Sequence, residues 1–483
     1  MDPSKLNRRT YGDHLTPINI FNEFILPEIK NILYDYIWID LFAGYGNLIL
    51  PILDLIPQTE RVEYFQKHIF LFDIQKESIE QAIENAAIYG IPKQIAEQNI
   101  ILRDTIKDYP KFLLNSGLPV YHITNPPYLY LGYIAKHQET RKYLEYFTGE
   151  NEGYQDLYQL GLKNDLKHNL SKMIYIIPSN FLFGYTSSNK IKYDFFKYYS
   201  INKAVIFEKE IFEYTGTNVA ICFFERKQEP KHEVFSFEGI KINNETHKRN
   251  YVLDPKNHYR PGNEFDLFVN DFRAKKPLEI KYYLEMEDVN KNEGDNEVDV
   301  IDANDYKGRE YEKKKIYVNN KFHKKIKSNI LFVRTVDKYK MGEKAGLYIT
   351  KDIFGVDGVL VSKSTHRTHP IQIFIKPILS KKDQKLLKDY FNLMLEYFRE
   401  TTDSEFLTTY KYSHNEYTRK YVGLLQIKKL IKTFPLLNLS DNERAIFIDL
   451  IEKRNTEELK NFVKNVNNNI NLNIYDEQQN WIC

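Results

Sequence analysis

Cys222 and Cys483 are the only cysteines in the 483-residue sequence. Two thiols cannot supply a disulfide framework or a cysteine-based metal site, and their scarcity is typical of a protein in a reducing compartment. The sequence also lacks any apolar run approaching the roughly 18 residues of a membrane-spanning helix, and it has no charged-then-apolar leader. We therefore expect a cytoplasmic protein that binds no metal and does not span a membrane.

A strong net charge is also missing, because 68 Lys and Arg are balanced by 66 Asp and Glu. The total charge therefore favours no class of partner, but the distribution is uneven. Residues 301–350 hold 13 Lys and Arg against 6 Asp and Glu. Such a patch attracts phosphates, although a solvated lysine-rich surface would have the same composition. The length predicts two or three domains.

The stretch His122-Ile-Thr-Asn-Pro-Pro-Tyr-Leu129 is the most informative feature of the sequence. An apolar run over 118–123 predicts a strand, and the two prolines end it because neither has an N–H to donate. The turn would present the Asn125 amide, the Pro126 carbonyl and the Tyr128 ring. The two oxygens could accept both N–H groups of an exocyclic amine while the ring stacks on its base. An ordinary proline turn would show the same residues.

A glycine motif lies upstream of this turn. Residues 36–39 predict a buried parallel strand that Asp40 closes, Gly44 and Gly46 form a tight loop, and a helix follows from Leu48. This order is typical of nucleotide-binding α/β proteins. The third glycine of the dinucleotide fingerprint is absent, and an acid at the strand end would repel phosphate. We therefore expect this loop to bind a cationic group.

Two further predicted strands, 68–73 and 99–103, end in Asp73 and Asp104. The carboxyl ends of parallel strands line one crevice, so Asp40, Asp73, Asp104 and Asn125 should meet there. Three acids without basic residues suit a cationic ligand that carries a nucleoside but no phosphate. S-adenosylmethionine has an ammonium group, a sulfonium, two ribose hydroxyls and an adenine amine, and it fits this description.

The order of these motifs resembles that of the adenine-N6 DNA methyltransferases of restriction–modification systems. The matching features are Thr16-Pro17 at a predicted helix start, with Thr16 as N-cap, then the D-x-F-A-G-x-G motif from Asp40, the strand-end acids and Asn125-Pro-Pro-Tyr128. The resemblance covers about the first 230 residues. Within this family, the sequence most resembles the subgroup whose cofactor motifs come first and whose target-recognition domain is C-terminal.

The resemblance implies an α/β fold, in which a mostly parallel, Rossmann-like methyltransferase sheet is closed by an antiparallel hairpin. Residues 1–230 would form this catalytic domain. Residues 231–305 would connect it, through an exposed acidic loop, to a DNA target-recognition domain over 306–483. That domain would be mixed α+β and end in helices. The substrate would be double-stranded DNA, the functional partner a cognate restriction endonuclease, and the protein a monomer or dimer.

The resemblance also assigns site residues. Asp73 would bind the ribose, Asp104 the adenine amine of the cofactor, and Ile74 and Pro127 would pack on its ring. The implied cofactor-binding residues are Thr16, Asp40, Gly44, Gly46, Asp73, Ile74, Asp104 and Pro127. Asn125, Pro126 and Tyr128 would hold the target adenine. The sequence departs from the family at Thr105, where a large apolar residue is usual.

Two groups of residues are weaker candidates. Phe212 lies between two predicted hairpin strands, where the family places an aromatic residue against the flipped base, and hairpin packing explains it equally well. Lys363-Ser-Thr-His-Arg-Thr-His369 could contact base edges from a groove, or could be a polar turn. The DNA-contact candidates are Lys338, Lys340, Lys363 and Arg367.

Other substrates remain open. Glutamine methyltransferases that act on release factors share Asn-Pro-Pro-Tyr, but their glycine motif follows a helical domain, whereas here it begins near residue 36. RNA adenine is a second alternative, and a modification or DNA-binding subunit that needs a partner is a third. Cytosine-N4 methylation is disfavoured because those enzymes usually carry serine at the position of Asn125.

Overall fold

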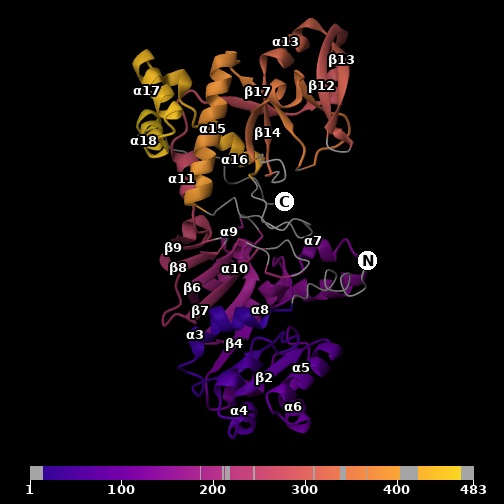
Figure 1. Ribbon diagram of the computed structural model, residues 1–483, viewed down its shortest axis with the longest axis vertical. Coiled ribbons are helices and arrows are strands. Elements are labelled where there is room, and N and C mark those ends of the chain that lie inside the picture. Colours follow the sequence, from indigo (N-terminus) through magenta and orange to yellow (C-terminus); the bar gives the residue numbers. More distant parts are fainter. Residues whose placement is uncertain are drawn as a thin grey trace. The chain divides into compact units, whose positions relative to one another are not determined.

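The computed structural model describes residues 15–184, 187–208, 211–212, 218–242, 245–307, 310–337, 344–366, 368–402 and 422–468 (Figure 1). The chain divides into two compact units, and the division falls between Pro261 and Gly262. Each unit has its own hydrophobic core.

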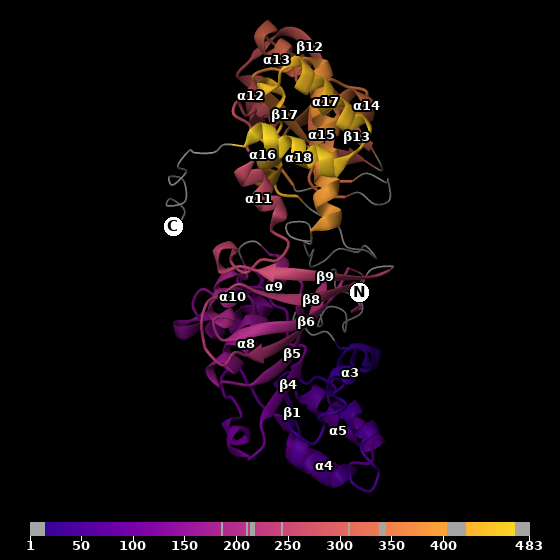
Figure 2. The ribbon, with the colours of Figure 1, turned by 90° about the vertical axis from the view of Figure 1, so that its left-hand side faces the viewer.

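The first unit is built on one nine-stranded sheet with the order β3-β2-β1-β4-β5-β7-β6-β8-β9. Figure 2 shows several of these strands following one another across the sheet. The strands are β1 (Ile37–Asp40), β2 (Ile69–Asp73), β3 (Ile100–Leu102), β4 (Val120–Thr124), β5 (Lys172–Pro178), β6 (Tyr199–Phe207), β7 (Val219–Arg226), β8 (Phe235–Ile242) and β9 (Thr246–Leu253).

Strands β1 to β5 are parallel, as their apolar sequences predict. Every residue of β1 and β4 is buried, which is the pattern of a parallel strand covered on both faces. Because these strands run the same way, their carboxyl ends meet at one edge of the sheet. Asp40, Asp73 and Asn125 are therefore brought to the same edge, as the sequence predicts.

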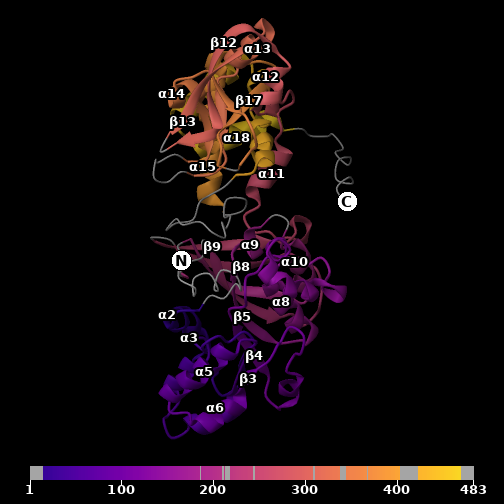
Figure 3. The ribbon, with the colours of Figure 1, turned by 90° about the vertical axis from the view of Figure 1, so that its right-hand side faces the viewer.

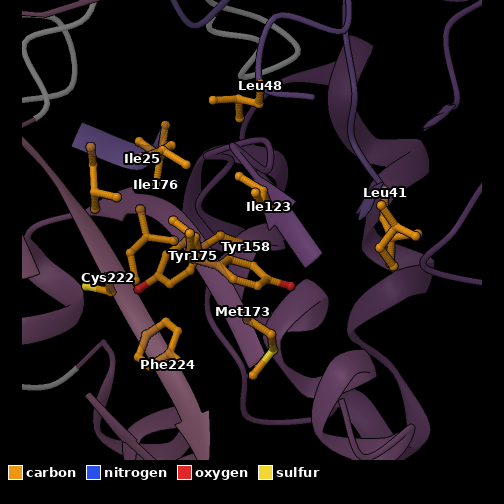
Figure 4. Close-up of a cluster of buried hydrophobic side chains, with 14 of the residues drawn as sticks. Ile25, Leu41, Leu48, Ile123, Tyr158, Met173, Tyr175, Ile176, Cys222 and Phe224 are labelled. Carbon is orange, nitrogen blue, oxygen red and sulfur yellow. The ribbon is translucent and has the colours of Figure 1, made fainter. Parts of the chain in front are cut away.

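Helices cover this sheet, and Figure 3 shows α5 and α6 near β3. The helical segments of the first unit are α2 (Ile18–Ile20), η1 (Phe21–Ile25), α3 (Leu26–Ile29), η2 (Leu50–Leu55), α4 (Arg61–His68), α5 (Lys76–Ile88), α6 (Lys93–Asn99), η3 (Lys111–Asn115), α7 (Leu131–Ile134), η4 (Gln138–Phe147), η5 (Gly149–Asn151), α8 (Leu157–Lys167), α9 (Asn180–Phe183), α10 (Asn189–Phe196) and η6 (Pro255–Asn257). Figure 4 shows Ile123, Tyr158, Met173 and Tyr175 within the core.

The predicted closing hairpin is confirmed, because β7 pairs antiparallel with both β5 and β6. The sheet does not stop there. Strand β8 pairs parallel with β6, and β9 pairs antiparallel with β8. The first unit therefore extends to Pro261 rather than to about residue 230, since two strands beyond the hairpin continue the same sheet.

The second unit contains two four-stranded sheets, ordered β10-β17-β14-β15 and β11-β16-β12-β13. Their strands are β10 (Glu279–Tyr282), β11 (Leu284–Glu285), β12 (Glu293–Lys307), β13 (Glu310–Val318), β14 (Leu331–Arg334), β15 (Gly346–Ile349), β16 (Gly358–Val361) and β17 (Ile371–Lys376). The mixed α+β character implied for this part of the chain is confirmed.

Helices of the second unit pack mainly around α15, which contacts β15, α16, α17 and α18. The helices are α11 (Glu264–Asp271), α12 (Met286–Asn290), α13 (Asn320–Ser328), α14 (Thr350–Phe354), α15 (Lys381–Thr401), α16 (Leu424–Ile431), η8 (Leu436–Asn438), α17 (Asp441–Glu452) and α18 (Thr456–Asn467). Ser380 caps α15 by accepting a hydrogen bond from Asp383 N at 3.1 Å. No helix within the described residues has the length and apolar character needed to cross a bilayer.

The acidic stretch predicted as an exposed loop forms most of β12 instead. Exposed positions alternate with half-buried or buried ones along its first half, and Val298, Val300 and Ile301 lie in the core. Strand β13 pairs with it antiparallel. The acidic composition reflects the solvent-facing side of a half-buried strand, because such strands alternate polar and apolar residues.

Candidate active site

The loop after β1 is held by side chains from neighbouring strands. Asp40 is only 1% exposed, and its Oδ1 accepts hydrogen bonds from Thr124 Oγ1 at 2.6 Å and Phe42 N at 3.0 Å. Burial raises the pKa of Asp40 to about 6, because the carboxylate loses its hydration. Gly44 and Gly46 have φ values of +51° and +79°, which confirms the predicted glycine turn.

Asp73 connects the second strand to this loop. Its Oδ2 accepts a hydrogen bond from Gly44 N at 2.9 Å, and its Oδ1 accepts one from Gln75 N at 2.8 Å. Burial raises the pKa of Asp73 despite these donors. The backbone N–H of Ile74 also bonds to this carboxylate, which leaves one lone-pair position for a ligand hydroxyl. The next residue, Ile74, is 51% exposed and offers an apolar surface.

We expect Gly46→Ala to weaken cofactor binding at least tenfold, because a Cβ there would lie 2.7 Å from Cδ1 of the buried Leu50 side chain, so that this side chain or the loop must shift. The control is Gly90→Ala, whose φ of +85° gives similar backbone strain but whose Cβ would meet nothing within 4 Å. Both variants should lose about 1–2 kcal/mol of stability. Calorimetric titration with S-adenosylmethionine separates them, and equal affinities in the two variants would contradict a role for the loop.

Asp104 lies two residues beyond the end of β3 and is half-buried. Its Oδ2 accepts a hydrogen bond from the Tyr146 hydroxyl at 2.8 Å, and its Oδ1 accepts one from Lys107 N at 3.3 Å. Thr105 is buried and donates from Oγ1 to Leu41 O at 2.8 Å. The residue at the position where this sequence departs from the family therefore supports the loop after Asp40.

The strand-end acids (Asp40, Asp73 and Asp104) form no ion pair with any of the described residues. The basic side chains flanking Asp104, Arg103 and Lys107, pair with other carboxylates at 2.7 Å. Three carboxylates with no basic partner among the described residues, together with an exposed isoleucine, match a cationic nucleoside. These residues therefore fit S-adenosylmethionine.

Asn125 follows β4 directly and is half-buried. Its Nδ2 donates to Thr16 Oγ1 at 3.0 Å, and its Oδ1 contacts the Tyr128 hydroxyl. The prediction that Thr16 caps a helix is wrong, because α2 has Pro17 at its N-cap and no side-chain cap bond. The Thr16 hydroxyl instead contacts the Asn125 amide, 109 residues away in the sequence.

The Tyr128 ring is not exposed, contrary to the sequence prediction. It is 1% exposed, and its single hydroxyl hydrogen is shared between two acceptors, Asn125 Oδ1 and Ile176 O, the latter at 2.8 Å. Pro126 is buried and Pro127 is half-buried. In this conformation Tyr128 holds the Asn125 amide in place, and stacking on a base would require the ring or its covering residues to move.

The weaker candidates divide into three groups. Phe212 is 2% exposed and belongs to the main core, so its position agrees with hairpin packing. Lys363 is exposed, and its backbone N donates to Asn304 Oδ1 at 3.0 Å. The remaining DNA-contact candidates, Lys338, Lys340 and Arg367, lie outside the described residues.

Sequence reasoning missed a buried polar cluster behind the loop, formed by Tyr109, His122, Asp165 and Tyr175. Two signals were available. A histidine interrupts the apolar run of β4, and an aspartate lies among the buried residues of α8.

Comparisons with known proteins agree with the sequence motifs. The family model described as N-6 DNA Methylase matches residues 5–307, which is more than half of the chain. A search of curated proteins found no match.

Solved structures give weaker similarities. A type I restriction–modification methyltransferase subunit from Streptococcus thermophilus is 14% identical, with 49% of this chain and 50% of that chain covered and a TM-score of 0.35. The enzyme LlaBIII bound to DNA, described as an ATP-dependent Type ISP restriction–modification enzyme, is 14% identical over 51% of this chain and 22% of that chain, with a TM-score of 0.37. A DrdV–DNA complex is 13% identical over 53% and 32%, with a TM-score of 0.38.

The chain spans half or less of the length of these three solved relatives. Their TM-scores are low, so the assignment rests on the family model and on the motifs. The resemblance to N6 DNA methyltransferases is confirmed by that model. The chain therefore belongs to the N-6 DNA methylase family, and S-adenosylmethionine is its cofactor.

Proposed function

We propose that the chain transfers a methyl group from S-adenosylmethionine to the N6 amine of an adenine flipped out of duplex DNA, which protects that site from a cognate restriction endonuclease. One observation carries the proposal. The Asn125 amide directly follows Thr124, whose hydroxyl lies 2.6 Å from the Asp40 carboxylate. One short segment of β4 thus joins the proposed target-amine acceptor to the proposed cofactor acid.

The proposed role of Asn125 is to accept a hydrogen bond from the target amine. An adenine amine is a poor nucleophile, because its lone pair is delocalised into the ring. The Asn125 Oδ1 and the Pro126 carbonyl would each accept one N–H, which favours a tetrahedral nitrogen and localises the lone pair. Oδ1 has two lone pairs, so it can accept this bond while Tyr128 occupies the other. These fixed acceptors match the positive charge that develops on nitrogen.

The strand-end acids would position the cofactor. Asp40 would bind the ammonium group, Asp73 the ribose hydroxyls and Asp104 the adenine amine, with Ile74 against the ring. Bound S-adenosylmethionine would supply the electrophilic methyl group. The protein would add orientation, because a direct transfer depends on an in-line approach of the two reacting atoms. No general base is needed before attack, since the proton leaves after the nitrogen becomes cationic.

A duplex hides the N6 amine, so the base must leave the stack before it can react. Tyr128 is the proposed stacking partner once its ring is uncovered, and Phe212 would need to be uncovered in the same way. The second unit is the proposed DNA-recognition domain. Lys363 is its best-supported contact among the described residues, because its exposed side chain projects from a backbone fixed to Asn304.

Lys363→Ala should weaken DNA binding and lower the slope of log K against log salt by about one, as expected for the loss of one phosphate contact. The control is Lys385→Ala, which removes an exposed lysine elsewhere in the second unit, on α15. Fluorescence anisotropy at several salt concentrations measures both slopes. Identical slopes for the two variants would show that Lys363 does not contact DNA.

The substrate can be tested directly. Purified protein would be incubated with labelled S-adenosylmethionine and, separately, with duplex DNA of mixed sequence, total RNA and a release-factor protein. Nucleoside analysis should find N6-methyladenine in the DNA. Label in RNA or protein alone would overturn the DNA substrate, and label nowhere despite cofactor binding would overturn independent action in favour of a partner subunit.

A further inference from the structure

A buried histidine supports the loop that follows Asp40. His122 and Thr124 are two residues apart on β4, so their side chains lie on the same face of the strand. Thr124 contacts Asp40, and His122 Nε2 lies 3.2 Å from Leu41 N, the next backbone group of the loop. The His122 side chain is fully buried. One strand therefore holds two consecutive residues of the loop.

Hydrogen-bond geometry fixes the proton on this imidazole. The backbone N–H of Leu41 can only donate, so Nε2 must offer its lone pair. The proton of the neutral ring is then on Nδ1, which lies 2.6 Å from Asp165 Oδ2. Asp165, from α8, is also fully buried, and it accepts a hydrogen bond from the Tyr175 hydroxyl at 2.5 Å. Asp165 thus selects one tautomer of His122.

We propose that His122 and Asp165 are a positioning pair for the cofactor-binding loop. Asp165 fixes the orientation and tautomer of the ring, and His122 holds Leu41 N so that Asp40 faces the ligand. The inference rests on the proposed role of the loop in binding S-adenosylmethionine, and it adds residues that touch neither cofactor nor target. Without His122 the buried N–H of Leu41 would lose its partner.

Packing alone does not explain these residues. On the neighbouring strand β5, Met173 pairs with His122 and Tyr175 with Thr124, and both β5 side chains are buried in the main core (Figure 4). A buried charge or polar pair in such a core is usually no more stabilising than apolar side chains of similar volume. Other side chains hold the loop as well, since Leu41 O accepts a bond from Thr105 and Gly44 N donates to Asp73. Its shape depends on side chains from other strands, and His122 provides one of these contacts.

The test is Asp165→Asn, which keeps the volume but offers an amide. With a carboxamide beside it, the ring can place its proton on Nε2, where it opposes the Leu41 N–H. The dissociation constant for S-adenosylmethionine should rise about 10- to 100-fold, as is typical when the partner of an orienting side chain is removed. The KM for S-adenosylmethionine should rise, whereas kcat measured at saturating S-adenosylmethionine should change much less. Nitrogen-15 NMR of the imidazole should show Nδ1 protonated in the wild type and Nε2 protonated in the variant.

Asn99→Ala is the matched control, because Asn99 is buried in the same unit and donates to Phe65 O, Gln66 O and Ile69 O. It should lower the melting temperature without changing cofactor affinity. If Asp165→Asn does not fold, Tyr175→Phe removes one donor to Asp165, and it should weaken cofactor binding more than Asn99→Ala does. The wild-type NMR spectrum tests the tautomer independently of any variant.

Three results would overturn the proposal. Asp165→Asn or Tyr175→Phe could bind the cofactor as the Asn99→Ala control does, or the wild-type ring could carry its proton on Nε2. A wild-type protein that binds no S-adenosylmethionine would overturn the loop's role together with the pair. The cofactor-binding and NMR measurements need no DNA, so methylation of another substrate would contradict the proposed function and leave the pair intact.

Discussion

Asn125→Ala should lower kcat for methyl transfer by about 100- to 1,000-fold, the usual effect of removing one fixed hydrogen-bonding group aimed at a developing charge. The alanine leaves the target amine with only the Pro126 carbonyl as acceptor. Dissociation constants for S-adenosylmethionine and DNA should change little, because the strand-end acids and the second unit remain intact. Single-turnover kinetics with labelled cofactor measure the chemical step, and calorimetry measures cofactor binding.

Asn99→Ala again provides the control for a lost buried amide, since Asn99 bonds only to backbone carbonyls remote from Asn125 in the sequence. It should retain kcat at a temperature below its melting point. If Asn125→Ala reduced cofactor affinity as much as kcat, the amide would belong to the cofactor site, and its proposed contact with the target amine would be wrong.

Asp40→Asn should weaken cofactor binding at pH 8 by about 10- to 100-fold, because the ammonium group would lose a buried, charged partner. The wild-type affinity should fall with decreasing pH below the Asp40 pKa of about 6, by about tenfold per pH unit. The variant should show no such dependence. Calorimetry between pH 5 and pH 8 tests this, and parallel pH profiles for the two proteins would contradict it.

The same pKa predicts an opposite effect on the stability of the free protein. The Asp40 pKa rises from 3.8 to about 6 on folding, so folding favours its protonated form. Its contribution to stability is therefore fully present below pH 3.8 and is lost as the pH rises through about 6. The difference corresponds to about 3 kcal/mol. Without cofactor, Asp40→Asn should unfold at a higher urea concentration than the wild type at pH 8.

The parts of the site that the sequence predicted depend on local rules. Prolines end β4 after Thr124, and parallel strands bring Asp40 and Asp73 to one edge, so neighbouring residues in the sequence sufficed. The contacts of Thr16 and Thr105 could not be predicted in this way. Their partners lie 109 and 64 residues away, and a hydroxyl that could cap a helix bonds a distant group when tertiary packing brings one closer.

Composition was the least reliable guide to the fold. The acidic residues of β12 indicated a loop, but Val298 and Val300 at alternate positions are the signal of a half-buried strand. The apparent end of the catalytic domain followed the family's hairpin, whereas β8 pairs with β6 beyond it. Tyr128 was expected to expose its ring, but the ring lies edge-on against Tyr158 and its hydroxyl reaches Ile176 O, and both partners are distant in the sequence.

One measurement tests the central claim most directly. The chain and its Asn125→Ala variant would be expressed separately in a host that lacks adenine methylation, and the genomic DNA would be read by sequencing that detects N6-methyladenine. The account predicts methylated adenine at one recurring sequence with the wild type and none with the variant. Methylation that persists in the variant, or wild-type DNA without methylated adenine, would contradict it.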